Sequence, residues 1–310
     1  MIRAALAWLL LAATAWWAFQ PAAPSPRADG VPVTPATQLA EQRTGPIRYA
    51  YRRLCEELTH PPRSCDRWHL VGVDGRRWWM PEKSGSPGGL ALSPDGLMIA
   101  RGKETVILQR VDGSVTPTEI PMGELAFSLD GRFLAVRGTA DVVVLEIATG
   151  RRRSFALPEH AALHGWTSTS VVLTVVSRSD STPGHLATAE IMELDATSGR
   201  TSRRPVAVNL AARLTLSPDG RTLATVPSRG PTLVDLATAE ATRTLPFPSA
   251  REVIRWLDGT RLLVRADLPP GGFGSLRSYH VLDLTTGAPR RLDVDDTDAD
   301  DGSLVIGAAE

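Results

Sequence analysis

The sequence lacks an excess of charge of either sign: its 310 residues include 34 lysines and arginines and 34 aspartates and glutamates. A protein that binds nucleic acid through phosphates shows a basic excess or a basic stripe. The balance therefore argues against nucleic acid as a partner. Aromatic residues are scarce at 5%, but apolar residues reach 43%, which is enough for a sizeable globular core.

Sequence motifs typical of enzymes are missing as well. There is no Gly-x-Ser-x-Gly nucleophile elbow, no His-Glu-x-x-His helix and no phosphate-binding loop. The glycine-rich residues 271–274 lie between expected strands with no following helix, so they indicate a loop. We therefore expect a protein that is not an enzyme and that holds no cofactor.

Cysteine is rare, with only Cys55 and Cys65 in the chain. Two thiols so close in sequence tend to pair in an oxidising compartment, and we predict a disulfide between them. In the chain-entropy model such a short loop stabilises the fold by about 3 kcal/mol. The alternative is two unrelated buried thiols. A metal site needs more ligands than this pair supplies, so none is expected.

The long apolar run of the chain lies at the N-terminus, where Arg3 precedes residues 4–19. A short basic start followed by an apolar stretch is an export signal. The run spans roughly 24 Å as a helix, against about 30 Å for the hydrocarbon core, and Trp16 and Trp17 suit the membrane interface. We predict that residues 1–20 remain as an uncleaved anchor, with the rest of the chain outside the cytoplasm. The alternative is cleavage near residues 13–15 and secretion.

The segment after the apolar run consists of two parts that differ in composition. Residues 21–46 hold six prolines among small and polar residues and are predicted to be an extended linker. Apolar side chains then recur at helical spacing, at Ile47, Ala50, Tyr51, Leu54, Cys55 and Leu58. Pro61 and Pro62 are expected to end this helix. We therefore predict a short amphipathic helix with the disulfide loop over residues 47–67.

The remainder of the chain is built from a repeat, which decides the fold class. An apolar strand, a turn of the Ser-Pro-Asp-Gly type and a second apolar strand recur every 35 to 51 residues. Asp-Gly between two apolar runs is a strong hairpin signal, because glycine reaches positive φ without steric cost. The turns of the copies lie at residues 93–96, 128–131, 166–170, 217–220, 257–259 and 300–302.

Each repeat also carries a second hairpin, as a four-stranded blade requires. The chain stops after the first hairpin of its last repeat, and residues 68–81 supply an unmatched second hairpin around Asp74 and Gly75. We predict an all-β fold, a six-bladed β-propeller over residues 68–310 closed by pairing of these N- and C-terminal hairpins. Closure removes exposed sheet edges. Seven blades are the alternative.

The Ser-Pro-Asp-Gly hairpins resemble the WD40-like repeats of six-bladed propellers related to the periplasmic protein TolB. The resemblance covers residues 68–310. It implies the propeller architecture and, less specifically, a protein-binding role, since such propellers mostly bind proteins and some carry enzyme sites. The Trp-Asp dipeptide and Gly-His pair of true WD40 repeats are absent, so the partners of those proteins are not carried over.

The loops that join the two hairpins of a blade lie on one face of a propeller, and they are unequal here. Two of them are long, residues 177–189 and 267–278, and extra loop length points to a contact surface. Residues 293–300 should lie on the same face; their aspartates depart from the EF-hand pattern and indicate a solvated turn, not a Ca²⁺ site. The predicted interaction residues are Ser179, Asp180, His185, Pro270, Phe273, Asp296 and Asp298.

Three runs of arginine follow second-hairpin turns, at residues 151–153, 203–204 and 290–291. This position places them on the outer strand of a blade. They are therefore expected to be solvated charge without a further role.

These observations predict a monomeric, extracytoplasmic propeller, tethered to the membrane by residues 1–20 only, that acts as a protein-interaction or envelope scaffold through one loop face. Two other functions stay open. One is a hydrolase or lyase whose acids meet at the central channel and leave no linear signature. The other is a sensor of small molecules or carbohydrate. Acids or histidines gathered in the channel would favour an enzyme, and an apolar patch would favour binding.

Overall fold

The computed structural model describes residues 37–38, 45–52, 68–80, 89–177, 188–206, 214–227, 230–267, 277–291 and 305–307. The chain divides into two units, Met1–Pro35 and Ala36–Glu310, and all the described residues belong to the second. The predicted anchor at residues 1–20 lies outside them, as do Cys55 and Cys65. Within the described part of the chain, no helix is long and apolar enough to cross a membrane.

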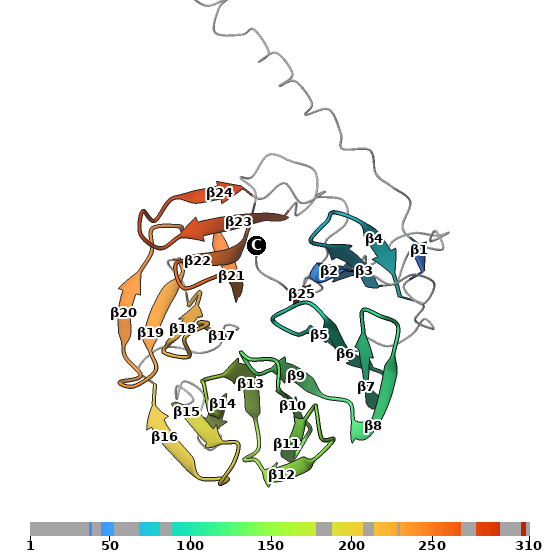
Figure 1. Cartoon of the computed structure of the whole chain (residues 1–310). Coiled ribbons are helices and arrows are strands. Elements are labelled where there is room, and N and C mark those ends of the chain that lie inside the picture. Colours follow the sequence, from blue (N-terminus) through green and yellow to red (C-terminus); the bar gives the residue numbers. More distant parts are fainter. Residues whose placement is uncertain are drawn as a thin grey trace, which may run out of the picture. The chain divides into compact units, whose positions relative to one another are not determined.

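The described residues form six β-sheets arranged around a centre, which confirms the predicted six-bladed propeller (Figure 1). Five sheets are four-stranded blades formed by consecutive strands. Blade 1 contains β5 (Leu90–Leu92), β6 (Met98–Gly102), β7 (Thr105–Arg110) and β8 (Val115–Pro121). Blade 2 contains β9 (Glu124–Phe127), β10 (Phe133–Arg137), β11 (Asp141–Glu146) and β12 (Arg152–Ala156).

The other blades repeat this order, and the first strand of each blade lies next to the centre (Figure 1). Blade 3 contains β13 (Ala161–Trp166), β14 (Ser170–Ser177), β15 (Thr188–Asp195) and β16 (Thr201–Pro205). Blade 4 contains β17 (Thr215–Leu216), β18 (Thr222–Thr225), β19 (Thr232–Asp235) and β20 (Ala241–Thr244). Blade 5 contains β21 (Ala250–Trp256), β22 (Arg261–Asp267), β23 (Arg277–Asp283) and β24 (Pro289–Arg291).

The sixth sheet, called here the terminal sheet, has the order β1 (Thr37–Gln38), β4 (Arg77–Trp79), β3 (Trp68–Gly72), β2 (Ile47–Arg52) and β25 (Val305–Ile306). Its innermost strand therefore comes from the C-terminal end of the chain. Antiparallel pairing of Tyr49 with Ile306 joins the two ends of the described chain in one sheet.

The turn serine explains why the repeat folds as a hairpin. In blade 4 the Ser217 hydroxyl donates to Asp219 Oδ1 at 2.5 Å and accepts the N–H of Thr222 at 2.9 Å. Gly220 closes the turn at φ +69°, in the left-handed region that glycine adopts without strain. Ser93 and Ser128 make the same bonds in blades 1 and 2. The four-residue turn is thus specified locally, independently of the rest of the fold.

The core lies between neighbouring sheets, because both faces of each blade are covered. On β22, Leu262 and Val264 pack toward blade 4, whereas Leu263, between them in sequence, packs toward the terminal sheet. All three side chains are fully buried. A strand buried on both faces is an uninterrupted apolar run, not an alternating one.

Strand β2 shows that the predicted amphipathic helix is wrong where the structure describes it. Ile47–Arg52 form a strand, and residues 53–58 lie outside the described residues. The register with β3 shifts between Ile47 and Tyr49, a β-bulge that inserts one residue. Ile47 and Ala50 therefore share a face that packs on blade 1, while Tyr49 packs toward blade 5. The bulge gives apolar residues a spacing of three, which imitates a helix.

The composition of the terminal sheet also differs from the predicted pair of hairpins. The β3–β4 hairpin with its turn at Asp74 and Gly75 is present. However, β2 precedes it in the same sheet, and β25 is the C-terminal strand that pairs there. Strand β1 lies within the predicted linker and pairs in parallel with β4. The blade-forming part of the chain therefore begins before residue 68.

Arginines on the outer strands of blades 2, 3 and 4 connect each blade to the next. In each case Nη1 donates to the carbonyl oxygen of the residue that follows the third strand of the next blade. The acceptors are Ala196 for Arg153 (3.3 Å), Leu236 for Arg204 (2.7 Å) and Leu284 for Arg243 (2.6 Å). The expectation of merely solvated charge is thus wrong for Arg153 and Arg204, although both lie on outer strands.

We expect Arg204→Ala to lower the free energy of unfolding by about 1–3 kcal/mol, because it removes bonds to both the Leu236 carbonyl and the Glu193 carboxylate. The neighbouring Arg203 is the matched control, since it makes only an exposed 3.8 Å ion pair with Glu190, which contributes little. Urea unfolding of the two alanine variants measures the difference. Equal losses of stability would show that the contact between blades contributes nothing.

Candidate binding site in the central channel

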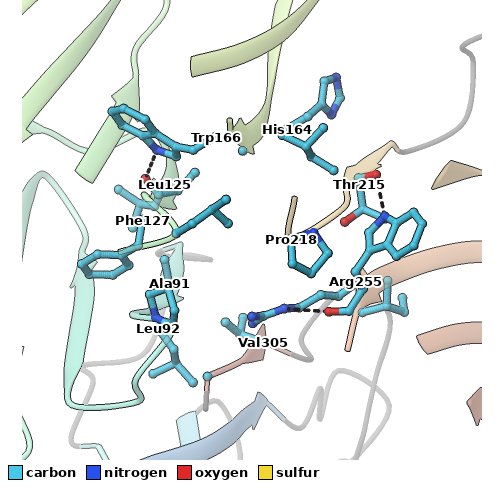
Figure 2. Close-up of a pocket in the computed structure, with 18 of the residues that line it drawn as sticks. Ala91, Leu92, Leu125, Phe127, His164, Trp166, Thr215, Pro218, Arg255 and Val305 are labelled. Carbon is cyan, nitrogen blue, oxygen red and sulfur yellow. Dashed lines mark hydrogen bonds between the residues drawn. The ribbon is translucent and has the colours of Figure 1, made fainter. Parts of the chain in front are cut away.

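A cavity of about 610 Å³ lies at the centre of the propeller, and residues of all six innermost strands line it (Figure 2). The lining includes the last residues of five of these strands, Val305 of the sixth, and also Pro94, Leu129 and Pro218 from the turns that follow three of them. The cavity therefore lies at the end of the channel that the Ser-Pro-Asp-Gly turns surround. Its size is typical of a ligand pocket.

The repeat places an equivalent residue at the penultimate position of each innermost strand, and all of these line the cavity. Five of the six are small or short: Ala91, Ala126, Gly165, Thr215 and Val305. The sixth is Arg255 of β21, a long cationic side chain (Figure 2). Among these six positions, the only charged side chain is thus on the side of blade 5.

Two of the innermost strands contain a bulge in this region. The register of β13 shifts between Leu163 and Gly165, and that of β21 shifts between Val253 and Arg255. The inserted residues, His164 and Ile254, both line the cavity. Bulges turn additional side chains toward a site. The strands β13 and β21 therefore each add one larger side chain to a channel that is otherwise lined by equivalent positions of the repeat.

Two tryptophans end the bulged strands and fix their position against the preceding blade. Trp166 Nε1 donates to the Ala126 carbonyl at 2.9 Å, and Trp256 Nε1 donates to the Thr215 carbonyl at 3.1 Å (Figure 2). Both indoles are almost completely buried. A buried Trp needs such a partner for its N–H, and here the partner is the innermost strand next to it.

The polar groups of the cavity are few. His164 lies within hydrogen-bond distance of the Leu214 carbonyl through Nδ1 (3.2 Å) and of Thr174 Oγ1 through Nε2 (2.7 Å). Asp258 at the rim accepts from Arg261 Nε at 2.6 Å. Arg255 Nε donates to the Trp256 carbonyl at 3.2 Å. The acidic and histidine side chains of the lining are therefore engaged within the protein.

Burial lowers the pKa of Arg255 to about 10, because an apolar environment disfavours the charged form. The side chain still carries its positive charge at neutral pH. A guanidinium in such a cavity interacts with an anion much more strongly than it would in water. Among the described lining residues, apolar side chains are therefore combined with one buried cationic group.

Two observations on the described residues concern the enzymatic alternative. In that part of the chain, no group of three His, Cys, Asp or Glu side chains is placed so that it could hold a metal ion. A serine–histidine pair exists on β23, where Ser278 Oγ lies 2.8 Å from His280 Nε2. Ser278 is only 1% exposed and does not line the cavity, so its hydroxyl is not placed to attack a substrate.

The residues predicted as interaction sites from the sequence all lie outside the described residues. These are Ser179, Asp180, His185, Pro270, Phe273, Asp296 and Asp298. The strands that flank the two long loops, β14 with β15 and β22 with β23, are the second and third of their blades. The sequence does not reveal the cavity because its lining is divided among all six repeats, with two to six residues from each. Alignment of the copies at the Asp-Gly turn and the apolar strand before it would show Leu129 in place of proline and Arg255 in place of a small residue.

No protein-family model matches the sequence, and a search of curated proteins finds no match either. Solved structures do match the fold. TolB from Acinetobacter baumannii superposes with a TM-score of 0.59 at 16% identity, over 86% of this chain and 67% of that one. The fold is that of a TolB-like six-bladed β-propeller.

Two further structures agree with this assignment. A putative TolB from Agrobacterium tumefaciens gives a TM-score of 0.51 at 15% identity, over 80% of this chain and 89% of that one. The β-propeller domain of the Trilobed protease from Pyrococcus furiosus, described as having an open velcro topology, gives 0.51 at 13% identity, over 73% and 76%. At such identities the TolB-like propeller is a statement about architecture.

Proposed function

We propose that this chain is an extracytoplasmic, membrane-tethered propeller that binds a partner protein at the mouth of its central channel, as a monomer and without catalysis. The observation that carries the proposal is the apolar rim of the cavity. Leu129 is 41% exposed there, at the position that proline occupies in blades 1 and 4, and Pro218 is exposed as well. Exposed apolar side chains at the rim of a concave site are typical of a binding surface.

The shape of the site favours a partner protein that inserts a protruding segment over one that presents a flat surface. The lining is a ring of strand ends with turns around it, so a bound group enters along the channel and contacts several blades at once. Buried apolar anchors of this kind dominate protein interfaces. The fold, which is similar to that of TolB proteins, supports the same reading.

The location outside the cytoplasm rests on the sequence. Arg3 and the apolar residues 4–19 have the pattern of an export signal, and Cys55 and Cys65 fit an oxidising compartment. Cell fractionation of the full chain tests this part. Recovery in the membrane fraction, with the propeller accessible to protease from outside the cytoplasm, is the expected result; protection from added protease would contradict it.

We expect a photo-crosslinking amino acid at position 129 to form a discrete adduct with one protein in cells. Val115 on β8 is the matched control, because it is 52% exposed and apolar but lies on an outer strand away from the cavity. Leu129→Ser should weaken binding of the identified protein by about tenfold or more, with little change in stability. Val115→Ser should leave binding unchanged. Equal adducts from both positions would place the interface elsewhere, and no adduct from position 129 would overturn the proposal.

A further inference from the structure

We propose that the propeller ring opens reversibly at one seam, the contact between blade 5 and the terminal sheet, while the other five seams stay closed. Strands β22 and β23 form one side of this seam, and β2 and β3 form the other (Figure 1). Residues on both sides of it, Ile254 of β21 and Val305 of β25, line the central cavity. Opening at this seam therefore widens the channel.

The first support is the spacing of the innermost strands. Around the ring, β5 contacts β9, β9 contacts β13, β13 contacts β17, β17 contacts β21, and β25 contacts β5. Between β21 and β25 the contact is weaker than at any of these five places. The shortness of β25 does not explain this, because β17 is equally short and contacts both of its neighbours. The wall of the channel is thus least continuous at this seam.

The second support is the composition of the seam, which is aromatic and polar. All three tyrosines of the chain, Tyr49, Tyr51 and Tyr279, belong to its cluster. Tyr51 also stacks on His69 of β3, with the ring centroids 5.0 Å apart. The cores of the other seams are built mainly from aliphatic side chains together with Trp and Phe. A tyrosine or histidine exposed by opening gains hydrogen bonds to water that a leucine does not, so exposing this seam costs less free energy.

The third support is an ion pair that blade 5 holds at the seam. Glu252 of β21 and Arg265 of β22 lie 2.9 Å apart, and their side chains are only 13% and 18% exposed. Arg265 shares a face of β22 with Leu263, and its neighbour on β23 is Tyr279. The cost of removing two charges from water offsets much of their attraction. The pair therefore adds little to the stability of the closed seam, and opening hydrates both charges.

Strand β22 supplies a matched pair of probes, because neighbouring residues on it face different seams. Leu262 packs toward blade 4 and Leu263 toward the terminal sheet, and both are fully buried. The test uses the full chain in detergent without denaturant. We expect Leu263→Cys to react with a thiol reagent about tenfold or more faster than Leu262→Cys. Peptide mass spectrometry assigns each label to its position, which keeps reaction of Cys55 and Cys65 separate.

The same comparison on β3 tests the other side of the seam. Leu70 packs toward blade 1 and Val71 toward blade 5, so Val71→Cys should react faster than Leu70→Cys. Val71 is 6% exposed and Leu70 is fully buried, so the pair on β22 is the stricter comparison. Opening of one seam exposes less surface than unfolding does. Labelling at positions 71 and 263 should therefore depend weakly on urea, whereas labelling at positions 70 and 262 should follow global unfolding.

Three results would overturn the proposal. Equal rates at positions 262 and 263 would show that the seams open only together. A faster rate at position 262 would place the opening between blades 4 and 5. A fast rate at position 263 without a fast rate at position 71 would show fraying of β22 alone. Thermal unfolding confirms that each variant is folded, and the pair on β3 decides the matter if a leucine variant of β22 does not fold.

Discussion

Replacing Trp256 by alanine is expected to lower the free energy of unfolding by about 3–5 kcal/mol, as for other large-to-small changes of buried aromatic residues. Trp256 is 4% exposed and packs with Val253, Leu262 and Leu284 in the core between blades 4 and 5. Alanine leaves a cavity there and leaves the Thr215 carbonyl without its indole N–H donor. Denaturant unfolding monitored by circular dichroism measures the loss.

The variant Trp256→Phe is the control that separates packing from hydrogen bonding. It keeps most of the ring but not the N–H group, so we expect it to lose only about 1–2 kcal/mol. An alanine variant no less stable than the phenylalanine variant would contradict the packing argument. Because Trp256 also lines the channel, binding at the channel mouth should fall in the alanine variant as well.

Replacing Gly307 by alanine is expected to be nearly as harmful, with a loss of about 3 kcal/mol. The Gly307 N–H donates to the Arg48 carbonyl at 2.8 Å, directly after β25. A Cβ atom at this position would approach the Ile47 carbonyl oxygen to 2.3 Å, so β25 must move away from β2. The variant would then lose the hydrogen bonds of that pairing in addition to the strain of overpacking.

Gly45→Ala serves as the control for Gly307→Ala, because a Cβ at Gly45 meets nothing within 4 Å. It lies just before β2, so it tests the same sheet with no steric conflict. The melting temperatures of the two variants give the comparison. Similar values would show that the pairing of β25 with β2 does not hold the terminal sheet together.

Much of the fold follows from local chemistry that can be read along the chain. The turns at Ser93, Ser128 and Ser217 form as predicted, because the serine hydroxyl, the aspartate and the glycine satisfy each other within six residues. The second hairpins are equally local. Backbone N–H groups of Thr286 and Thr285 bond to Asp283 and hold the pKa of that carboxyl below its ordinary value. The number of blades follows from counting such turns.

The candidate site could not be predicted from local sequence patterns in the same way. Arg255 and Leu129 lie 126 positions apart in the sequence and meet at one cavity only because the ring brings every innermost strand to the same centre. The length of the loops predicts that Ser179 and Phe273 contact a partner. Both residues lie outside the described residues, so their role stays a prediction. The arginine contacts between blades also depend on the ring, since the acceptor of Arg204 belongs to the next blade.

By itself, the sequence determined the hairpins, their number and the all-β class, because each turn is stabilised by atoms that are neighbours along the chain. The tertiary structure decided that Ile47–Arg52 is a strand, because its two faces are buried by blades 1 and 5 and a bulge sets its spacing. It also decided that β25 completes that sheet. The channel, with Arg255 among small residues, is a property of the ring, because positions of different repeats come together only when the blades are arranged around one centre.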